Sequence, residues 1–309
     1  MSTTQANSHR TGTVTSGDVE IFYRHFGSAT DQAPILILHG AGYYDSADWV
    51  EVAAELAADG REVVAFDARG YGRSSWSASA NYSLDAQLSD IAALTGHLGW
   101  ERPVLLGHSR GGSFTLRYAD AFPDRVGAAI FADSCPGRTA RGPVSVGAGG
   151  AAAEQPVYVT LAEALASTSR DPSSLERPAA HARLEELFTQ APGGYVLSAR
   201  DPRFQSSRPV DQPDWQSRFG AIDLWAALEG LRVPTLIIRA TGSQSFDVAS
   251  VARVHSEASN ARYVEIDSDH DLANQAPAAL VAAVRQFLGL QGAENASHSV
   301  GIRFRSRTL

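Results

Sequence analysis

The chain has 309 residues, of which 44% are hydrophobic and 19% are charged, a composition typical of one globular domain with room for an inserted subdomain. Its formal net charge is −8, so we expect no basic surface that would attract nucleic acid or an anionic membrane. All 26 basic residues are arginine, which excludes mechanisms that depend on lysine, such as Schiff-base formation. The composition therefore predicts small-molecule partners, and it leaves open whether the chain forms a homo-oligomer.

The chain contains one cysteine, Cys135, so it can form neither an internal disulfide nor a zinc site with several cysteines. Its first residues are polar and lack the apolar segment of a secretory signal, so we expect residues 1–12 to be a disordered leader. No apolar run approaches the roughly 18 residues that a membrane-spanning helix needs. These features together predict a cytoplasmic protein.

Hydrophobic patterning predicts strands that alternate with helices. Two β-prone runs, 13–16 and 19–24, flank the turn pair Gly17-Asp18 and predict an antiparallel hairpin at a sheet edge. Continuous apolar runs, as expected of parallel strands buried on both faces, follow at 34–38, 63–66, 103–106, 128–131, 234–238 and 262–266. Segments with helical periodicity lie at 48–58, 83–98, 109–121, 248–258 and 277–288. The alternation predicts an α/β fold, a mostly parallel, doubly wound sheet with helices on both faces.

One interval lacks buried-strand runs, and it divides the predicted core in two. Residues 135–232 are rich in proline, glycine and arginine, contain helical pieces such as 161–166 and 181–188, and are too long for a simple loop. We interpret this interval as a helical cap inserted into a core formed by 13–134 and 233–290. Residues 291–309 are polar and predict a mobile tail.

The motif that carries chemistry is G-x-S-x-G at Gly107 to Gly111, which lies between a predicted buried strand and a predicted helix. A turn this sharp forces its central residue into strained backbone angles, so small neighbours are needed two positions before and after it. Ser109 is thereby presented at the N-terminus of a helix, where the helix dipole favours negative charge. This context indicates a nucleophilic serine.

With this motif the chain resembles the α/β-hydrolase superfamily, in its capped, serine-nucleophile branch, over nearly all of 13–290. Three further segments agree in order and spacing: His39-Gly-Ala-Gly42 after the first parallel strand, the D-x-R-G-x-G-x-S run Asp67–Ser74 after the next, and Ser268-Asp-His270 after the last. The resemblance implies an α/β-hydrolase fold and an enzyme that needs neither a cofactor nor a metal.

The resemblance also assigns roles to the residues that match. His270 is expected to be the general base that activates Ser109, because an alcohol is a poor nucleophile at neutral pH. The backbone N–H groups of Ala41 and Arg110 are expected to form the oxyanion hole. We expect His39 and His108 to belong to the scaffold of the site. The polar side chains of the segment 67–74 are expected to hold their own loop.

The acid of the triad departs from the commonest family pattern. After the strand 234–238, where most relatives carry an acid, the usual position falls on Ser243 or Gln244, and neither can be ionised at neutral pH. Asp247 is the nearest carboxylate there, but it lies late and fits equally well as a helix N-cap. Asp133, at the end of the strand 128–131, is the other candidate, because some relatives place their acid there. We favour Asp133 and keep Asp247 as the alternative.

Residues expected to contact a substrate are Tyr43 and Tyr44 beyond the oxyanion loop, His108 in the elbow and Trp215 in the cap. The leading functional prediction is a serine hydrolase that cleaves an ester, lactone or amide of a small to medium molecule through an acyl-enzyme. A hydrolase of carbon–carbon bonds and a cofactor-free oxygenase are the alternatives on the same fold. A ligand receptor is disfavoured, since nucleophile, base and oxyanion loop are all in place.

Overall fold

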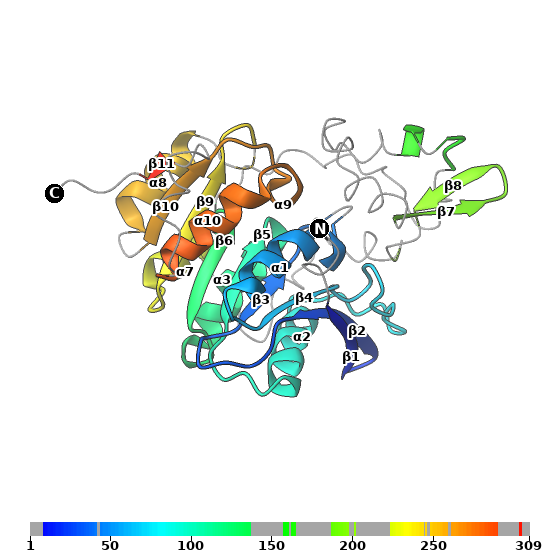
Figure 1. Cartoon of the computed structure of the whole chain (residues 1–309), viewed down its shortest axis with the longest axis horizontal. Helices are drawn as coiled ribbons and strands as arrows, with labels where there is room; N and C mark the ends of the chain where they lie inside the picture. Colours follow the sequence, from blue (N-terminus) through cyan, green and yellow to red (C-terminus); the bar gives the residue numbers. More distant parts are fainter. Residues whose placement is uncertain are drawn as a thin grey trace, which may run out of the picture.

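A nine-stranded sheet forms the centre of the protein in the computed structural model, which describes residues 9–41, 44–136, 157–160, 162–164, 187–197, 201, 223–243, 245, 248–258, 261–289 and 303–304 (Figure 1). From one edge to the other its strands are β1 (Arg10–Ser16), β2 (Val19–Phe26), β4 (Val63–Phe66), β3 (Ile35–Leu38), β5 (Val104–His108), β6 (Ala128–Ala132), β9 (Thr235–Ala240), β10 (Ala261–Ile266) and β11 (Arg303–Phe304). The predicted α/β class is confirmed.

The first two strands form the predicted antiparallel hairpin, with Ser16 paired to Val19 across the turn. Parallel pairing joins β4, β3, β5, β6, β9 and β10, in that order across the sheet. Strand β2 joins β4 in antiparallel orientation. Side chains of a strand point alternately to the two faces, so Leu36 and Leu38 enter one apolar core while Ile35 and Ile37 enter the other. Both faces are covered, which is why the parallel strands carry continuous apolar runs.

Helices cover both faces of the sheet (Figure 1). One apolar core contains side chains from α1 (Val50–Ala58), α9 (Leu272–Gln275) and α10 (Pro277–Phe287). The opposite core contains side chains from α2 (Leu84–His97), α3 (Arg110–Ala121), α7 (Leu224–Gly230) and α8 (Val248–Glu257). The 3-10 turn η1 (Ser46–Trp49) precedes α1 and begins with a capping box at Asp45. Because the loops after the parallel strands all meet at one edge of the sheet, residues from distant parts of the sequence come together there.

The described part of the predicted cap contains a hairpin that the sequence analysis did not predict. Strands β7 (Phe188–Ala191) and β8 (Gly194–Leu197) pair in antiparallel orientation and stand apart from the central sheet in Figure 1. Their turn contains Pro192 and Gly193, and Gly193 has a φ of +91°, a conformation that favours glycine. Most of the interval 135–232, including the bulk of the predicted helical pieces, lies outside the described residues, so the helical cap stays a prediction.

Asp201, also in the predicted cap, joins the insertion to the core. Its side chain is fully buried and accepts a hydrogen bond from the hydroxyl of Tyr82, while its N–H donates to the carbonyl oxygen of Gly70 at 2.9 Å. Both partners belong to core segments, and Gly70 lies in the loop that follows β4. This contact fixes one point of the insertion directly beside the loops at the carboxyl ends of the strands.

The two ends of the chain also contribute to the sheet. Strand β1 begins at Arg10, within the segment expected to be a leader, and β11 lies within the segment expected to be a tail. Strand β11 pairs with β10 in antiparallel orientation through Val264 and Phe304. The remaining residues of both segments lie outside the described part of the chain. Among the helices that the structure does describe, none has the length and apolarity to cross a membrane.

Candidate active site

Ser109 occupies the sharp turn between β5 and α3 that the G-x-S-x-G motif predicted. Its backbone has φ +52° and ψ −115°, angles that an L-residue adopts only under strain. Its N–H donates to the carbonyl oxygen of Ala132 at 3.1 Å, and its carbonyl oxygen accepts from Oγ of Ser134 at 2.7 Å. These hydrogen bonds to residues at and beyond the end of β6 fix the turn from outside, which is how the strained conformation persists.

The glycines on either side of Ser109 are required for steric reasons. A Cβ at Gly107 would lie 2.5 Å from the carbonyl oxygen of Gly111, and a Cβ at Gly111 would lie 2.1 Å from the carbonyl oxygen of Leu38. Side-chain carbons do not approach backbone oxygens this closely, so larger residues would push α3 away from β5 and β3. The steric reason inferred from the motif is confirmed, and the start of α3 lies directly against the end of β3.

Asp133, the favoured acid, contacts the imidazole of His270. It directly follows β6, and its Oδ2 lies 2.5 Å from Nδ1 of His270, which lies in the loop after β10. Its Oδ1 accepts from the N–H of Ala240 at 3.1 Å, and its own N–H donates to the carbonyl oxygen of Ile238 at 2.8 Å. The carboxylate is therefore held between the ends of β6 and β9 and directed at the imidazole. Asp247, the alternative acid, lies outside the described residues.

The environment of Asp133 keeps its carboxyl group ionised. Burial acts first and would raise the pKa of Asp133, because a buried carboxylate loses its hydration. The hydrogen bond and the charge of His270 lower it, and the Ser243 hydroxyl and the N–H of Ala240 lower it further. The net result is a pKa for Asp133 below its ordinary value. A buried carboxylate that stays ionised can stabilise positive charge on the imidazole it faces.

The imidazole of His270 is partly open to solvent, with 31% of its side chain exposed. Its Nδ1 also lies 3.2 Å from Oγ of Ser245, so the carboxylate and a hydroxyl share the same edge of the ring. Within the described part of the chain, no hydrogen bond joins Nε2 of His270 to Oγ of Ser109. Hydrogen bonds between nucleophile and base are often long in unliganded enzymes and shorten when substrate binds.

His108, the residue before Ser109, lies directly against His270. Its Nε2–H donates to the carbonyl oxygen of His270 at 2.8 Å, and the centroids of the two rings are 4.6 Å apart. The residue is buried, with 2% of its surface exposed. Tyr44 meets both rings at an edge, with centroids 5.0 Å from that of His108 and 6.3 Å from that of His270. The base and the nucleophile turn are thereby in direct packing contact.

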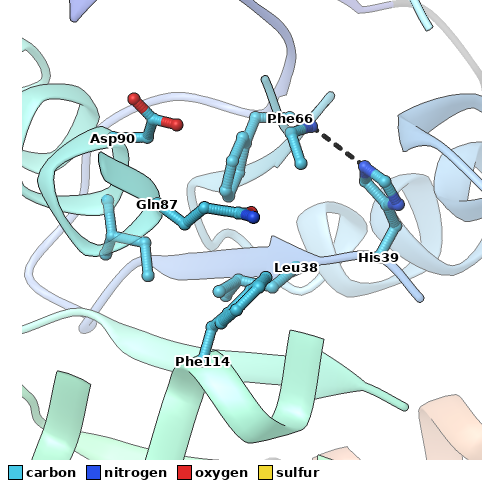
Figure 2. A pocket seen from close by; sticks show the side chains of 8 residues that line it. Leu38, His39, Phe66, Gln87, Asp90 and Phe114 are labelled. Carbon is cyan, nitrogen blue, oxygen red and sulfur yellow. Dashed lines mark hydrogen bonds between the residues drawn. The ribbon is translucent and has the colours of Figure 1, made fainter. Parts of the chain in front are cut away.

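The predicted oxyanion loop is held by His39. Nδ1–H of His39 donates to the carbonyl oxygen of Gly40 at 2.7 Å, and Nε2 accepts from the N–H of Ala68 at 2.9 Å, the dashed line in Figure 2. Burial, followed by the charge of Arg110, lowers the pKa of His39 to about 3, so the ring is neutral and its two hydrogen bonds define one tautomer. Ala41, whose N–H is an expected oxyanion donor, directly follows this fixed peptide.

Arg110 is the first residue of α3 and follows the N-cap residue Ser109, so its backbone N–H lies in the first turn of the helix. Its guanidinium group donates to the hydroxyl of Tyr71 at 2.9 Å and lies 3.5 Å from the carbonyl oxygen of Gly40. The side chain thus connects the helix start to the oxyanion loop. It also stacks on the ring of Tyr71, with the guanidinium carbon 4.3 Å from the ring centroid.

The loop after β4 has the structural role expected for it. The carboxylate of Asp67 accepts from the N–H groups of Ser46 and Arg73, both at 2.7 Å. Arg69 forms a two-pronged ion pair with Asp90 on α2, at 2.7 and 2.6 Å. The hydrogen bonds and the ion pair hold the loop in its shape, and these side chains are therefore assigned a structural role.

A small cavity lies beside His39, the first residue of the predicted oxyanion loop (Figure 2). The side chain of Gln87 points into it between Phe66 and Phe114, and the remaining lining residues are Leu38, His39, Ala68, Asp90 and Ile91. The cavity has room for about one water molecule. None of Ser109, Asp133 and His270 lines it, so this cavity is separate from the arrangement around the nucleophile.

The structure describes only one of the remaining predicted substrate contacts, and it adds a pair of serines that was not predicted. Tyr43 and Trp215, predicted substrate contacts, lie outside the described residues, whereas the ring of Tyr44 lies beside that of His270.

Two hydroxyls to which the sequence assigned no role, those of Ser243 and Ser245, lie beside Asp133 and His270. The signal for them was present, because Ser243 stands where most relatives carry their acid. Among the described residues, no group of three or more histidine, cysteine, aspartate and glutamate side chains could hold a metal ion.

A protein-family model described as the alpha/beta hydrolase fold matches residues 33–274. The chain belongs to the α/β-hydrolase fold family. Among curated proteins, this α/β hydrolase is 28% identical to an esterase of Mycobacterium tuberculosis over 263 residues, which cover 82% of each chain. It is 37% identical to a non-heme chloroperoxidase of Streptomyces lividans over 127 residues, 40% of this chain and 45% of that protein.

Solved structures agree with this family assignment at the level of the fold. The thioesterase domain from the curacin biosynthetic pathway superposes with a TM-score of 0.72 at 21% identity, over 90% of this chain and 99% of that domain. E-2-(acetamidomethylene)succinate hydrolase superposes with a TM-score of 0.71 at 22% identity, over 91% of this chain and all of that one. The family and the fold class predicted from the motifs are confirmed, as is an enzyme of α/β-hydrolase type.

Proposed function

We propose that this α/β hydrolase is a serine hydrolase that cleaves an ester, lactone or amide of a small to medium molecule through an acyl-enzyme. The observation that carries the proposal is the 2.5 Å contact between the buried carboxylate of Asp133 and Nδ1 of His270, next to the strained turn that presents Ser109. A carboxylate, an imidazole and a hydroxyl in this order form the unit that activates a serine alcohol.

The first half of the reaction acylates the enzyme. Oγ of Ser109 attacks the carbonyl carbon of the substrate, and Nε2 of His270 takes the hydroxyl proton as the new bond forms. The ionised carboxylate of Asp133 stabilises the imidazolium and holds its Nδ1–H edge in place. When the tetrahedral intermediate collapses, His270 returns the proton to the leaving alcohol or amine, which departs. Water, activated by His270 in the same way, then hydrolyses the acyl-enzyme and releases the carboxylic acid.

The negative oxygen of the tetrahedral intermediate needs donors that are already oriented. The N–H groups of Ala41 and Arg110 are the proposed donors, and one such donor is commonly worth about 3 kcal/mol in the transition state. The hydrogen bonds of His39 support this role, because they fix the peptide between Gly40 and Ala41 before substrate arrives. The first turn of α3 adds the favourable end of a helix dipole.

The relatives support hydrolysis of carbonyl compounds, but they do not decide whether the leaving group is an alcohol or an amine. Besides the esterase, curated relatives include an sn-1-specific diacylglycerol lipase of Danio rerio and a proline iminopeptidase of Lactobacillus delbrueckii. These names cover both ester and amide substrates. Tyr44, which lies at the edge of the His270 ring, is the described aromatic residue best placed to contact a substrate.

The proposal is tested with purified protein, p-nitrophenyl acetate and a panel of lactones and amides. We expect Ser109→Ala to lose activity by about 10⁴-fold or more, since the nucleophile is removed. Ser113→Ala, one turn further along α3, is the matched control and should retain the activity. A fluorophosphonate probe should label the wild-type protein at Ser109, located by mass spectrometry of the labelled peptide.

Retention of activity in Ser109→Ala, or labelling at another residue, would refute the proposed nucleophile. Oxygen uptake measured with heteroaromatic substrates separates hydrolysis from the oxygenase alternative, because hydrolysis consumes water and no oxygen. Hydrolysis of carbon–carbon bonds is separated by product analysis, since that reaction releases a carbon acid in place of an alcohol or amine.

A further inference from the structure

His108 contacts three parts of the candidate active site at once. It is the last residue of β5 and directly precedes Ser109, so it belongs to the nucleophile turn itself. Its Nε2 edge meets the carbonyl oxygen of His270 at 2.8 Å. Its Nδ1 edge faces the oxyanion loop so closely that a Cβ on Gly40 would lie 2.7 Å from Nδ1. The buried ring of His108 therefore lies between the nucleophile turn, the oxyanion loop and the base loop, which is the loop after β10 that carries His270.

The hydrogen bond from His108 to His270 has only one chemical form. A carbonyl oxygen can only accept, so Nε2 of His108 carries the proton and Nδ1 has none. Burial, together with the neighbouring His270, lowers the pKa of His108 to about 3, so the ring is neutral at ordinary pH. Within the described residues the buried Nδ1 atom has no hydrogen-bond partner. The ring is thus fixed by its single donor and by packing.

Other contacts of the base loop lead away from the nucleophile. The carbonyl oxygen of Ser268 accepts from the N–H of Gly242 at 2.9 Å, and the backbone N–H of Asp269 donates to the side chain of Gln275 at 3.0 Å. These hydrogen bonds fix the loop relative to β9 and α9. The bond from His108 differs, because it reaches the peptide of His270 from the residue adjacent to Ser109.

We propose that His108 is a positioning residue: through its neutral Nε2–H it fixes the backbone of the base His270 relative to the nucleophile turn. The inference rests on the proposed function, in which His270 serves Ser109. In this role His108 contacts neither the proton that moves from Ser109 to His270 nor the carbonyl group of the substrate. A shift of the base by a fraction of an ångström to one ångström is enough to slow proton transfer, and such misplacements can reduce rates by about a hundredfold.

Two substitutions at His108 separate the hydrogen bond from the packing. His108→Leu introduces an apolar side chain of similar bulk that has no donor, whereas His108→Gln retains an N–H near the place of Nε2. We expect kcat/KM for p-nitrophenyl acetate to fall by about tenfold to a hundredfold in His108→Leu. We expect His108→Gln to recover most of this loss. Thr115→Val is the matched control, because Thr115 is buried against Gly107 and its hydroxyl has no hydrogen-bond partner among the described residues.

A spectroscopic readout keeps positioning distinct from general loss of structure. The Nδ1 proton of His270 lies in a short hydrogen bond to Asp133 and is expected to give a proton NMR signal far downfield. That signal should persist in His108→Gln and in Thr115→Val, and should shift or broaden in His108→Leu. A His108→Leu variant with wild-type kcat/KM and an unchanged signal would overturn the proposal. An equal loss of kcat/KM in His108→Leu and His108→Gln would also overturn it.

The wild-type protein supplies a test that does not depend on the folding of any variant. With ¹⁵N-labelled histidine, His108 is expected to be the neutral Nε2–H tautomer and to show no titration between about pH 5 and 8. An Nδ1–H tautomer, or titration in that range, would contradict the proposal. Failure of fluorophosphonate labelling at Ser109 refutes the proposed function instead, so the two failures are distinguishable.

Discussion

Asp67 and Asp133 are both buried carboxylates that directly follow a parallel strand, yet the structure gives them different partners. Asp67, after β4, accepts from the backbone N–H groups of Ser46 and Arg73, which cannot change their protonation. Asp133, after β6, faces an imidazole at 2.5 Å. Burial raises the pKa of Asp67, whereas the partners of Asp133 outweigh its burial and lower its pKa. The second carboxylate faces an imidazole, a side chain that can gain and lose a proton near neutral pH.

The comparison shows that residue type and strand position do not distinguish a structural carboxylate from a functional one. Parallel strands place several polar residues at one edge of the sheet, and the donor opposite each carboxylate decides its role. Amide N–H donors hold a loop together. An imidazole with solvent on its other side, such as that of His270, can exchange protons with a substrate.

Among the changes that compare the two carboxylates, the largest expected effect is the loss of activity in Asp133→Asn. The amide has nearly the same shape but no charge, so it cannot stabilise the imidazolium and can reverse the tautomer of His270. We expect kcat to fall by about 10⁴-fold while the protein stays folded. Steady-state kinetics with p-nitrophenyl acetate, with circular dichroism to verify folding, provide the measurement. Activity close to that of the wild type would remove Asp133 from the mechanism.

Arg69→Leu should have the opposite profile, with stability lost and activity kept. It leaves the buried carboxylate of Asp90 without its two-pronged partner, and such a change typically costs about 3–5 kcal/mol of the free energy of unfolding. Urea unfolding measures this cost, and kcat/KM of the folded fraction should stay close to the wild-type value. Activity abolished at unchanged stability would mean that this loop takes part in the chemistry.

The two carboxylates should also differ in how their contribution to stability depends on pH. For Asp133 the folded pKa is depressed, so its contribution is fully present above the unfolded pKa of about 3.9 and is lost as the pH falls through the folded value. For Asp67 the folded pKa is raised, so its contribution is greatest below the unfolded value and declines as the pH rises through the folded value.

We therefore expect the stability deficit of Asp133→Asn to shrink on acidification and that of Asp67→Asn to grow. Urea unfolding of both variants and the wild type, from neutral pH down to about pH 2, which lies below the unfolded pKa of an aspartate, measures the two trends. The urea slopes of the three proteins serve as the control for an unchanged unfolding transition. Trends of the same sign would contradict the distinction between the two sites.

The smallest expected effect is that of Asp247→Asn. If Asp133 is the acid, Asp247→Asn removes no charge that the proposed reaction uses, so kcat/KM should change by less than about twofold. The same assay as for Asp133→Asn measures it. Loss of activity here, with Asp133→Asn fully active, would reverse the assignment of the acid.

Much of the fold was predictable because its signals are local. Strand β4 has the predicted bounds, Val63–Phe66, and the turn Gly17-Asp18 joins the predicted hairpin. The hairpin of β7 and β8 was missed, because its short strands lack the apolar runs of the central sheet and depend on the turn at Pro192 and Gly193. The pairing of β11 with β10 was missed for a related reason, since a two-residue strand carries no periodic signal.

The sequence by itself determined the nucleophile turn, because a serine between closely spaced glycines at the end of a buried strand admits few other structures. It also determined the loops that carry His39 and His270, which follow strands in a fixed order. Only the tertiary structure decided which carboxylate faces the imidazole and that the ring of His108 lies between the three loops. Those contacts join residues far apart in the chain, and their geometry follows from the register of the parallel strands, which no local pattern encodes.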